Sequence, residues 1–261
     1  MKIAPIVIVC KERYAKTATI MLRTYAEFHR APIHVIVDST GYNMLKEYNS
    51  ERIVIVKLQD YRDRAIAAVR VENKDFEVFD YEGDGDHDRV YSSLKPVIMD
   101  LVIQDMMPDA THILSLDADA LFSGNILRKV KIELNKPEQK DKDIYMVARE
   151  DPRMLRPKKC TPGSGFTLWR RDSKFIPLFK KHFVGKLGKF KGGGSQSLIN
   201  HIRRKLKGVV LQDPLLHFVS PDLNNKHFSD IQIKELKPAY IHLHGKDSYS
   251  RLLRFRRVLE V

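Results

Sequence analysis

The chain has 261 residues, of which 43% are hydrophobic and 30% are charged, so it describes a globular protein and excludes a disordered one. Its longest apolar runs, such as residues 5–10, are too short to span a bilayer, and the N-terminus lacks the pattern of a secretion signal. The only cysteines are Cys10 and Cys160, which excludes a disulfide framework. These features predict a soluble, cytoplasmic protein.

Positive charge is unevenly distributed along the chain, whose net charge is +13. Residues 1–151 contain 22 Lys and Arg against 26 Asp and Glu, a net charge of −4. Residues 152–261 contain 24 against 7, a net charge of +17. Such a segregated charge forms either a solvated basic surface or a field that attracts an anionic partner.

The N-terminal segment has the pattern of a doubly wound α/β protein. Residues 3–10 form an apolar, β-branched run typical of a buried parallel strand, and residues 11–30 place apolar side chains at helical spacing. Two further strands are expected at 33–40 and 52–58, with a helical segment at 42–49 between them. This succession predicts a mostly parallel sheet that binds ligands at the carboxyl ends of its strands.

The rest of the chain continues the alternation. We expect a helix at 92–107, with Pro96 near its first turn where proline is tolerated, and a strand at 111–122. Later strands and helices are expected at residues 143–150, 163–171, 175–187, 192–205, 209–219 and 238–245, followed by a basic C-terminal segment. No repeat or long linker interrupts the chain, so we expect a single compact domain over residues 1–261.

Residues 73–90 are acidic and contain glycines, which predicts a loop or a small hairpin. Asp84, Asp86 and Asp88 alternate as the ligands of a calcium loop do. Lys95, however, stands where such a loop needs its closing glutamate. The sequence therefore argues against a calcium site here.

Asp117 and Asp119 follow the apolar residues 113–116 directly. Two carboxylates at the end of a buried strand repel each other unless a cation lies between them. In a continuing strand both side chains would point to the same side, where Mg²⁺ or Mn²⁺ could accept their oxygens and keep positions open for substrate phosphates. The alternative is that Asp119 caps a helical turn and Asp117 forms an ordinary surface ion pair.

The segment LSLDADALF resembles the D-x-D segment of metal-dependent GT-A-fold glycosyltransferases, which transfer sugar from a nucleotide diphosphate donor. The strand APIVIVCKER is similar to the one that begins such domains and contacts the nucleotide. The resemblance implies a GT-A-like α/β domain with a nucleotide-sugar-binding half at 1–122, an acceptor-binding half at 123–261, a UDP-sugar donor and Mn²⁺ or Mg²⁺. It places these residues around the base and ribose: Cys10, Lys11, Arg13 and Asp38. It places Arg89 or Lys95 near the donor.

The C-terminal segment IHLHGK resembles the H-x-x-G segment with which family 8 glycosyltransferases complete the metal and diphosphate site. The resemblance implies that His242 is the third metal ligand and that Gly245 and Lys246 lie at the diphosphate. There a glycine permits close approach of the backbone, and a lysine neutralises charge on the leaving group. His244 lies on the same strand face and is an alternative ligand, although a histidine is also often structural.

Two segments between these motifs are also similar to family 8. REDPRM places Asp151 at the donor sugar, SQSLIN places Gln196 beneath the anomeric carbon, and GSGFTLWRR stands where the family has Asn-Ser-Gly-Val. The chain departs from the family at Gly163, which replaces the asparagine, and at Ser195 and Ser197, which replace two aspartates. The family's Lys-Pro-Trp ending is also absent.

The implied reaction is attack by an acceptor hydroxyl on the anomeric carbon while the nucleotide diphosphate leaves, with the metal as Lewis acid. An inverting enzyme also needs a carboxylate base near that hydroxyl, and the candidates are Asp213 and Glu150. A retaining enzyme does not need one, and Gln196 would then flank the reacting carbon. The sequence leaves the stereochemical course open.

The basic half predicts an anionic acceptor. Lys and Arg are interleaved with Phe, His and Leu in four segments, a composition suited to phosphate contacts and stacking: RPKK, KKHFVGKLGKFK, RRKLK and RLLRFRR. Our preferred hypothesis is a nucleic-acid acceptor, such as a hydroxyl on a modified DNA base. The alternative is an anionic polysaccharide or a lipid-linked intermediate at a membrane surface.

Three other classes of protein stay open. A haloacid-dehalogenase-like phosphatase also has D-x-D after an apolar strand, but it usually has Thr or Val in place of Leu121, and its later acidic motif is missing here. A sugar-nucleotide pyrophosphorylase would share the sheet and the metal but needs a Gly-rich N-terminal loop that this chain lacks. A non-catalytic nucleic-acid-binding protein would have no need of the carboxylate pair.

Overall fold

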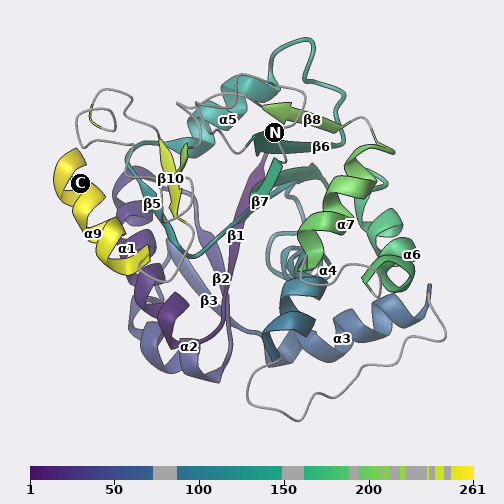
Figure 1. Cartoon of the computed structure of the whole chain (residues 1–261), viewed down its shortest axis with the longest axis horizontal. Helices are drawn as coiled ribbons and strands as arrows, with labels where there is room; N and C mark the ends of the chain where they lie inside the picture. Colours follow the sequence, from purple (N-terminus) through teal and green to yellow (C-terminus); the bar gives the residue numbers. More distant parts are fainter. Residues whose placement is uncertain are drawn as a thin grey trace.

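The structure is a computed structural model of the chain. It describes residues 1–72, 87–148, 162–187, 194–206, 208–211, 218–220, 234, 239–243 and 248–261. Within these ranges only the backbone is described at residues 87–92, 147–148, 162–164, 184–187, 194–197, 209–211 and 218–220. Helices lie on both sides of a central sheet (Figure 1).

The larger sheet has the strand order β3-β2-β1-β4-β7-β6-β8. Its strands are β3 (Ile53–Lys57), β2 (Ile33–Val37), β1 (Ile3–Val9), β4 (His112–Leu116), β7 (Pro162–Arg170), β6 (Ile144–Ala148) and β8 (Gly208–Leu211). All neighbours are parallel except that β7 runs antiparallel to β4 and β6. The mostly parallel α/β sheet predicted from the sequence is therefore confirmed.

Two groups of helices cover the two faces of this sheet (Figure 1). One face carries α1 (Glu12–Phe28), α2 (Ser39–Leu45), the short 3₁₀ helix η1 (Lys46–Tyr48) and α5 (Ile126–Leu134). The other face carries α3 (Gln59–Arg70), α4 (His87–Met106), α6 (Phe175–Leu187) and α7 (Gly194–Arg203). The sequence interpretation did not anticipate α3 or α5.

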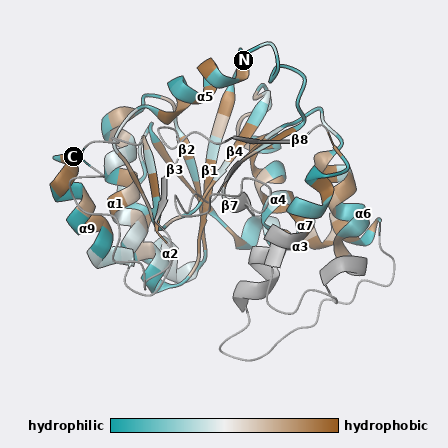
Figure 2. Ribbon diagram, turned by 45° about the horizontal axis from the view of Figure 1, so that its top comes forward, coloured by the Kyte–Doolittle hydropathy of each residue, from teal (hydrophilic) through white to brown (hydrophobic). Residues whose placement is uncertain are grey.

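Strand β1 is apolar without interruption because both of its faces are buried. Val7 and Val9 belong to the core under α1, whereas Ala4 and Ile6 belong to the core under α3 and α4. Successive side chains of a strand point to opposite faces, so a strand between two helical layers needs apolar residues at every position. Figure 2 shows the central strands largely brown and several of the surrounding helices banded in teal and brown, as expected for helices with one face in the core.

A smaller sheet lies beside the large one and has the order β5-β10-β9. It contains β5 (Ala120–Phe122), β10 (Tyr240–Leu243) and β9 (Phe218–Ser220). The C-terminal helix α9 (Ser248–Leu259) buries Leu252 and Phe255 against this sheet and α1. The expected continuous strand at 111–122 is wrong: it breaks after Leu116 because β5 pairs with β10 in the second sheet.

His29 joins α1 to the start of α5. The backbone N–H of Ile126 donates to its Nε2 (3.0 Å), so this nitrogen carries no proton. Its Nδ1 lies 3.0 Å from the Tyr25 carbonyl oxygen and is therefore the N–H donor. His29 also stacks on the Tyr25 ring, with centroids 4.3 Å apart. A buried imidazole thus fixes the position of α5 against α1.

No helix in the described ranges combines the length and the apolar composition that crossing a bilayer requires.

Candidate active site

Asp117 and Asp119 lie where the chain leaves the large sheet and enters the small one. The Asp117 N–H donates to the Gly165 carbonyl of β7 (3.2 Å), and the Leu243 N–H of β10 donates to the Asp119 carbonyl (2.9 Å). The backbone of each aspartate is therefore hydrogen-bonded to the backbone of a different sheet. The expected geometry of one continuing strand is wrong, although the two carboxylates still come together.

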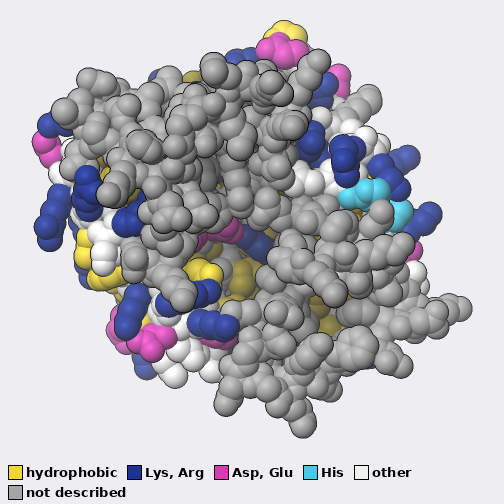
Figure 3. All heavy atoms as spheres, in the orientation of Figure 1, with side chains coloured by type: hydrophobic (Ala, Val, Ile, Leu, Met, Phe, Trp, Pro, Cys, Tyr) yellow, Lys and Arg dark blue, Asp and Glu magenta, His cyan; other side chains and the backbone are white. Residues whose placement is uncertain are grey.

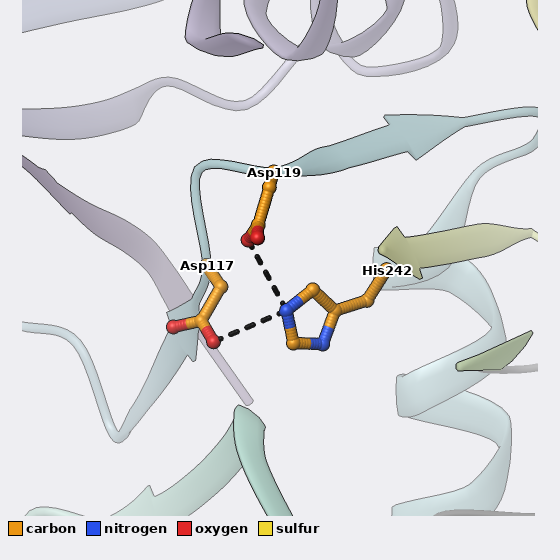
Figure 4. A group of neighbouring side chains, drawn as sticks. All are labelled: Asp117, Asp119 and His242. Atoms are coloured by element: carbon orange, nitrogen blue, oxygen red, sulfur yellow. Dashed lines mark ion pairs between the residues drawn. The ribbon is translucent and has the colours of Figure 1, made fainter. Parts of the chain in front are cut away.

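His242 of β10 completes a group of three side chains that are common metal ligands (Figure 4). Its Nε2 lies 3.3 Å from Asp117 Oδ2 and 3.2 Å from Asp119 Oδ1. The side chain of His242 is 1% exposed, whereas those of Asp117 and Asp119 are 26% and 12% exposed. The group is therefore closed behind the histidine and accessible to solvent on the side of the aspartates.

The surroundings of His242 favour a positive charge between the two carboxylates. Burial acts to lower the pKa of this imidazole, but the hydrogen bond to Asp119 and the charges of Asp119 and Asp117 outweigh it. The pKa of His242 is consequently raised above its usual value, despite an opposing effect from Lys95. The same electrostatics would favour a bound cation.

Lys95 also contacts this group of side chains, and it belongs to α4, on the face of the large sheet opposite to α1. Its Nζ lies 2.6 Å from Asp117 Oδ1 and 3.4 Å from the Leu116 carbonyl oxygen. The two oxygens of Asp117 are therefore divided, with Oδ1 toward Lys95 and Oδ2 toward His242. Lys95 was predicted near the donor, and it lies beside the predicted metal site.

Gly165 provides the space in which the imidazole of His242 lies. A Cβ at this position would be 2.2 Å from His242 Cε1 and 2.8 Å from Asp117 Oδ2, closer than real atoms approach. Sequence reasoning noticed the GSG segment but gave Gly165 no role. The available signal was a glycine inside a predicted strand, which often marks a close approach by another group.

Tyr14, in the first turn of α1, also lies near the carboxylates and was not singled out from the sequence. Burial raises its pKa, and the charges of Asp119 and Asp117 raise it further against the opposing effect of Arg13. Arg13 Nη2 donates to the Tyr14 hydroxyl (2.8 Å), and its guanidinium lies 4.5 Å from the centre of that ring. The predicted nucleotide-site residue Arg13 is thus placed beside Tyr14.

Asp38 joins the ends of β1 and β2. Its Oδ2 accepts the Lys11 N–H (2.9 Å) and its Oδ1 accepts the Gly41 N–H at the start of α2 (2.6 Å). Lys11 has φ 72°, in the left-handed region that non-glycine residues rarely adopt. A Cβ on Gly41 would lie 2.9 Å from the Val9 carbonyl oxygen, so glycine permits this close approach.

The structure therefore brings Lys11 and Asp38 together at the carboxyl edge of the sheet, next to the half-buried Cys10. Since both oxygens of Asp38 hold backbone N–H groups, this carboxylate fixes the end of β1 to the start of α2.

Several predicted residues lie outside the described residues: Asp84, Asp86, Glu150, Asp151, Asp213, His244, Gly245 and Lys246. For three more, only the backbone is described: Asp88 and Arg89 in α4, and Gln196 in α7. Their roles stay predictions.

The donor atoms fit a divalent cation. Two carboxylate oxygens and one imidazole nitrogen lie within 4.8 Å of one another, and the absence of a Cβ at Gly165 leaves the imidazole room. Carboxylates suit Mn²⁺ and Mg²⁺, and imidazole is a ligand of many divalent metals. Among the described residues, this is the one group of three or more His, Cys, Asp or Glu side chains so arranged.

Among the solved structures of similar fold are glycosyltransferases. Mouse xyloside xylosyltransferase 1, in its apo form, is 15% identical with a TM-score of 0.60, over 92% of this chain and 97% of that chain. The galactosyltransferase LgtC, in complex with donor and acceptor sugar analogs, is 10% identical with a TM-score of 0.55, over 100% of this chain and 95% of that one.

An active-site mutant of LgtC matches with the same identity and TM-score over 98% of this chain. No protein-family model and no curated protein sequence matches the chain. At this level of identity the comparison establishes the fold, and the predicted GT-A fold is confirmed.

Proposed function

We propose that the chain is a metal-dependent glycosyltransferase that moves a sugar from a UDP-sugar to an acceptor hydroxyl. The group of Asp117, Asp119 and His242 carries this proposal, because it lies at the junction of two sheets in a fold shared with glycosyltransferases. When bound, Mn²⁺ or Mg²⁺ supplies a Lewis acid for the negative charge that develops on the departing diphosphate.

The residues around this group would hold the donor. Lys95 fixes one oxygen of Asp117 and leaves the other directed at His242, which keeps the carboxylate in a single orientation. We assign Gly245 and Lys246, which follow β10 after one intervening residue, to the diphosphate. His244 stays the alternative metal ligand in this proposal. Cys10, Lys11 and Arg13 would line the nucleotide at the carboxyl end of β1.

The sugar would lie between the two proposed halves of the domain, residues 1–122 and 123–261. We assign Gln196, in the first turn of α7, to the anomeric carbon, and Asp151 to the hydroxyls of the donor sugar. If the reaction inverts configuration, Asp213 or Glu150 would accept the proton of the attacking hydroxyl.

For the acceptor we propose a nucleic acid, with a hydroxyl on a modified DNA base as the attacking group. Residues 173–212 support this proposal, because they contain ten Lys and Arg and no Asp or Glu. Dark-blue and cyan side chains gather over α6 and α7 in Figure 3. Described members of this basic surface are Lys180, Lys181, His182, His201, Arg203, Arg204 and Lys205.

Side chains of the basic surface lie close together. Lys205 Nζ donates a hydrogen bond to His182 Nε2 (3.2 Å), and the rings of His182 and His201 meet edge to face with centroids 5.7 Å apart. Burial and the neighbouring charge of Arg204 both lower the pKa of Arg203. Closely spaced cations of this kind gain stability when phosphates lie between them.

The chemistry of this surface favours a phosphate backbone over a membrane. A helix that binds a bilayer surface inserts exposed apolar side chains. Among the side chains of α6 and α7 that the structure describes, none is an exposed large hydrophobic one, and Phe179 and Ile202 are buried in the core.

The acceptor proposal is tested by fluorescence anisotropy with a labelled DNA duplex at increasing NaCl. We expect the logarithm of the binding constant to fall steeply and linearly with the logarithm of salt concentration, as counterion release requires. Absence of binding at low salt would exclude a nucleic-acid acceptor and leave the polysaccharide or lipid-linked alternative.

The donor and metal are tested by thermal unfolding with a panel of nucleotide sugars, each with and without Mn²⁺. A ligand that binds the native chain raises the Tm by mass action, and we expect that rise to need the metal. A panel in which no nucleotide sugar raises the Tm would contradict the proposed function.

A further inference from the structure

Tyr240 is a fully buried residue of β10 whose hydroxyl lies at the turn that carries Asp117. The Asp117 N–H donates to this hydroxyl at 3.2 Å. The hydroxyl lies 3.2 Å from the Gly165 carbonyl oxygen and 3.3 Å from the Asp117 carbonyl oxygen, and its single proton can be donated to either. One hydroxyl therefore contacts the backbone of β7 and both backbone groups of a predicted metal ligand.

These contacts join the two sheets at the point where the ligands meet. Asp117 follows the last strand residue of β4 in the large sheet, whereas His242 belongs to β10 in the small sheet. The separation of the ligand atoms therefore depends on how one sheet is placed against the other. The hydroxyl of Tyr240 reaches from β10 to β7 and so fixes that placement.

The position of Tyr240 along β10 links it directly to the ligand His242. Residues two apart in a strand point to the same side, and the rings of Tyr240 and His242 lie with centroids 6.5 Å apart. Contacts with Phe122 and Phe166, at centroid distances of 5.2 and 6.1 Å, hold the Tyr240 ring itself. The phenol is thus held on its apolar sides and has its hydroxyl directed at the Asp117 turn.

We propose that Tyr240 is a positioning residue for the metal site, which sets the distance between Asp117 and His242 by hydrogen-bonding β10 to the Asp117 turn and to β7. This inference rests on the proposed function, because it requires that the two residues bind a metal. It predicts a loss of metal affinity when only the hydroxyl oxygen is removed, since groups that orient metal ligands typically contribute about 10- to 100-fold in affinity.

The test is the affinity of the full chain for Mn²⁺, measured from the EPR signal of free Mn²⁺ without any donor. The variant is Tyr240→Phe, and the matched control is Tyr25→Phe. Tyr25 is equally buried, and its hydroxyl donates to the Ala31 carbonyl oxygen at 2.7 Å rather than to the backbone around the ligands. Both variants remove a tyrosine hydroxyl that donates to a backbone carbonyl oxygen, and Tyr240→Phe also removes the acceptor of the Asp117 N–H.

We expect Tyr240→Phe to raise the Kd for Mn²⁺ at least about tenfold and Tyr25→Phe to leave it within about twofold. If the variant chain is active, its kcat should return close to that of the wild type at saturating Mn²⁺, which a general loss of packing would not allow. Equal affinities of Tyr240→Phe and the wild type would overturn this inference and leave the proposed function intact. Failure of the wild type to bind Mn²⁺ would instead overturn both.

A second variant covers the case in which Tyr240→Phe does not fold. Tyr240→4-aminophenylalanine keeps a donor at the same place on a ring of similar size. We expect it to bind Mn²⁺ within about threefold of the wild type. A folded chain with this substitution and a Kd raised tenfold or more would contradict the assignment, because the retained donor would then have no effect on the site.

Discussion

Two buried histidines, His29 and His242, lie close to β5, and burial affects their charge in opposite ways. Each is 1% exposed. Burial lowers the pKa of His29 to about 4, against a smaller opposing effect of its hydrogen bond to the Tyr25 carbonyl. At His242 the carboxylates of Asp119 and Asp117 outweigh burial, and the pKa is raised.

The difference between these regions follows from the partners of each ring. Both ring nitrogens of His29 have backbone partners. Its Nδ1–H donates to the Tyr25 carbonyl oxygen and its Nε2 accepts from the Ile126 N–H, and only a neutral imidazole can do both. His242 faces two carboxylates, which favour a cation. Burial alone therefore does not distinguish a structural histidine from a candidate metal ligand, whereas the charge of its partners does.

The largest loss of metal binding and activity is expected from Asp119→Asn. This substitution removes one of the two carboxylate charges beside His242 and leaves the contacts of His29 unchanged. We expect the metal-dependent rise in Tm to disappear and glycosyl transfer to fall by on the order of a thousandfold or more, because a ligand and its charge are both lost. The measurements are thermal unfolding with a nucleotide sugar and Mn²⁺, and the steady-state rate.

The matched control for this prediction is Asp109→Asn, since Asp109 forms an exposed ion pair with Lys2. Exposed pairs contribute little, so this variant should behave like the wild type. Unchanged metal dependence in Asp119→Asn would show that the carboxylate pair is not a metal site.

The next effect is expected from Gly165→Ala, because its methyl group would occupy the place of the His242 ring. The imidazole has to move, so we expect Mn²⁺ affinity to fall by about 10- to 100-fold and the free energy of unfolding to fall by about 1–3 kcal/mol. Isothermal titration calorimetry and urea unfolding measure the two quantities.

Gly124→Ala serves as the comparison, since the atoms nearest to its added Cβ are 3.6 Å away, an ordinary contact. It should change neither quantity appreciably. Equal metal affinities in the two variants would mean that the space beside His242 has no part in binding.

The third prediction concerns the His29 region and its dependence on pH. A histidine whose pKa is about 4 when folded and 6.5 when unfolded stabilises the folded state fully above pH 6.5 and progressively less as the pH falls toward 4. The decrease in the free energy of unfolding that His29 causes when the pH falls from above 6.5 to below 4 is on the order of 3 kcal/mol. Urea unfolding of the wild type and His29→Gln at pH 7 and pH 4.5 measures it.

We expect the free energy of unfolding of His29→Gln to fall less over this pH interval than that of the wild type. Part of the decrease should persist in the variant, because burial also lowers the pKa of His112 to about 4. The same decrease in both chains would show that His29 is not neutral in the folded state.

The features that the sequence predicted are those encoded by residues close together along the chain. The uninterrupted apolar run of β1 requires a strand buried on both faces, and the D-x-D segment presents two carboxylates within three residues. A recognisable C-terminal motif also predicted His242, which the structure brings to the same point.

The remaining features of the site depend on contacts between distant residues. The hydroxyl of Tyr240 meets residues 123 and 75 positions away along the chain, and nothing in its local sequence indicates this. Likewise, the strand breaks at Asp117 because of hydrogen bonds to β7 and β10 rather than because of a local turn signal. Gly165 acquires its role only when His242 is placed against it.

The most direct test of the metal site is a crystal of this chain soaked with MnCl₂ and UDP, with diffraction collected at the manganese absorption edge. We predict an anomalous difference peak within coordination distance of Asp117, Asp119 and His242, and UDP whose diphosphate oxygens contact the same peak. UDP bound with no anomalous peak at these three side chains, or a peak at other residues, would contradict the proposal that they form the metal site of a glycosyltransferase.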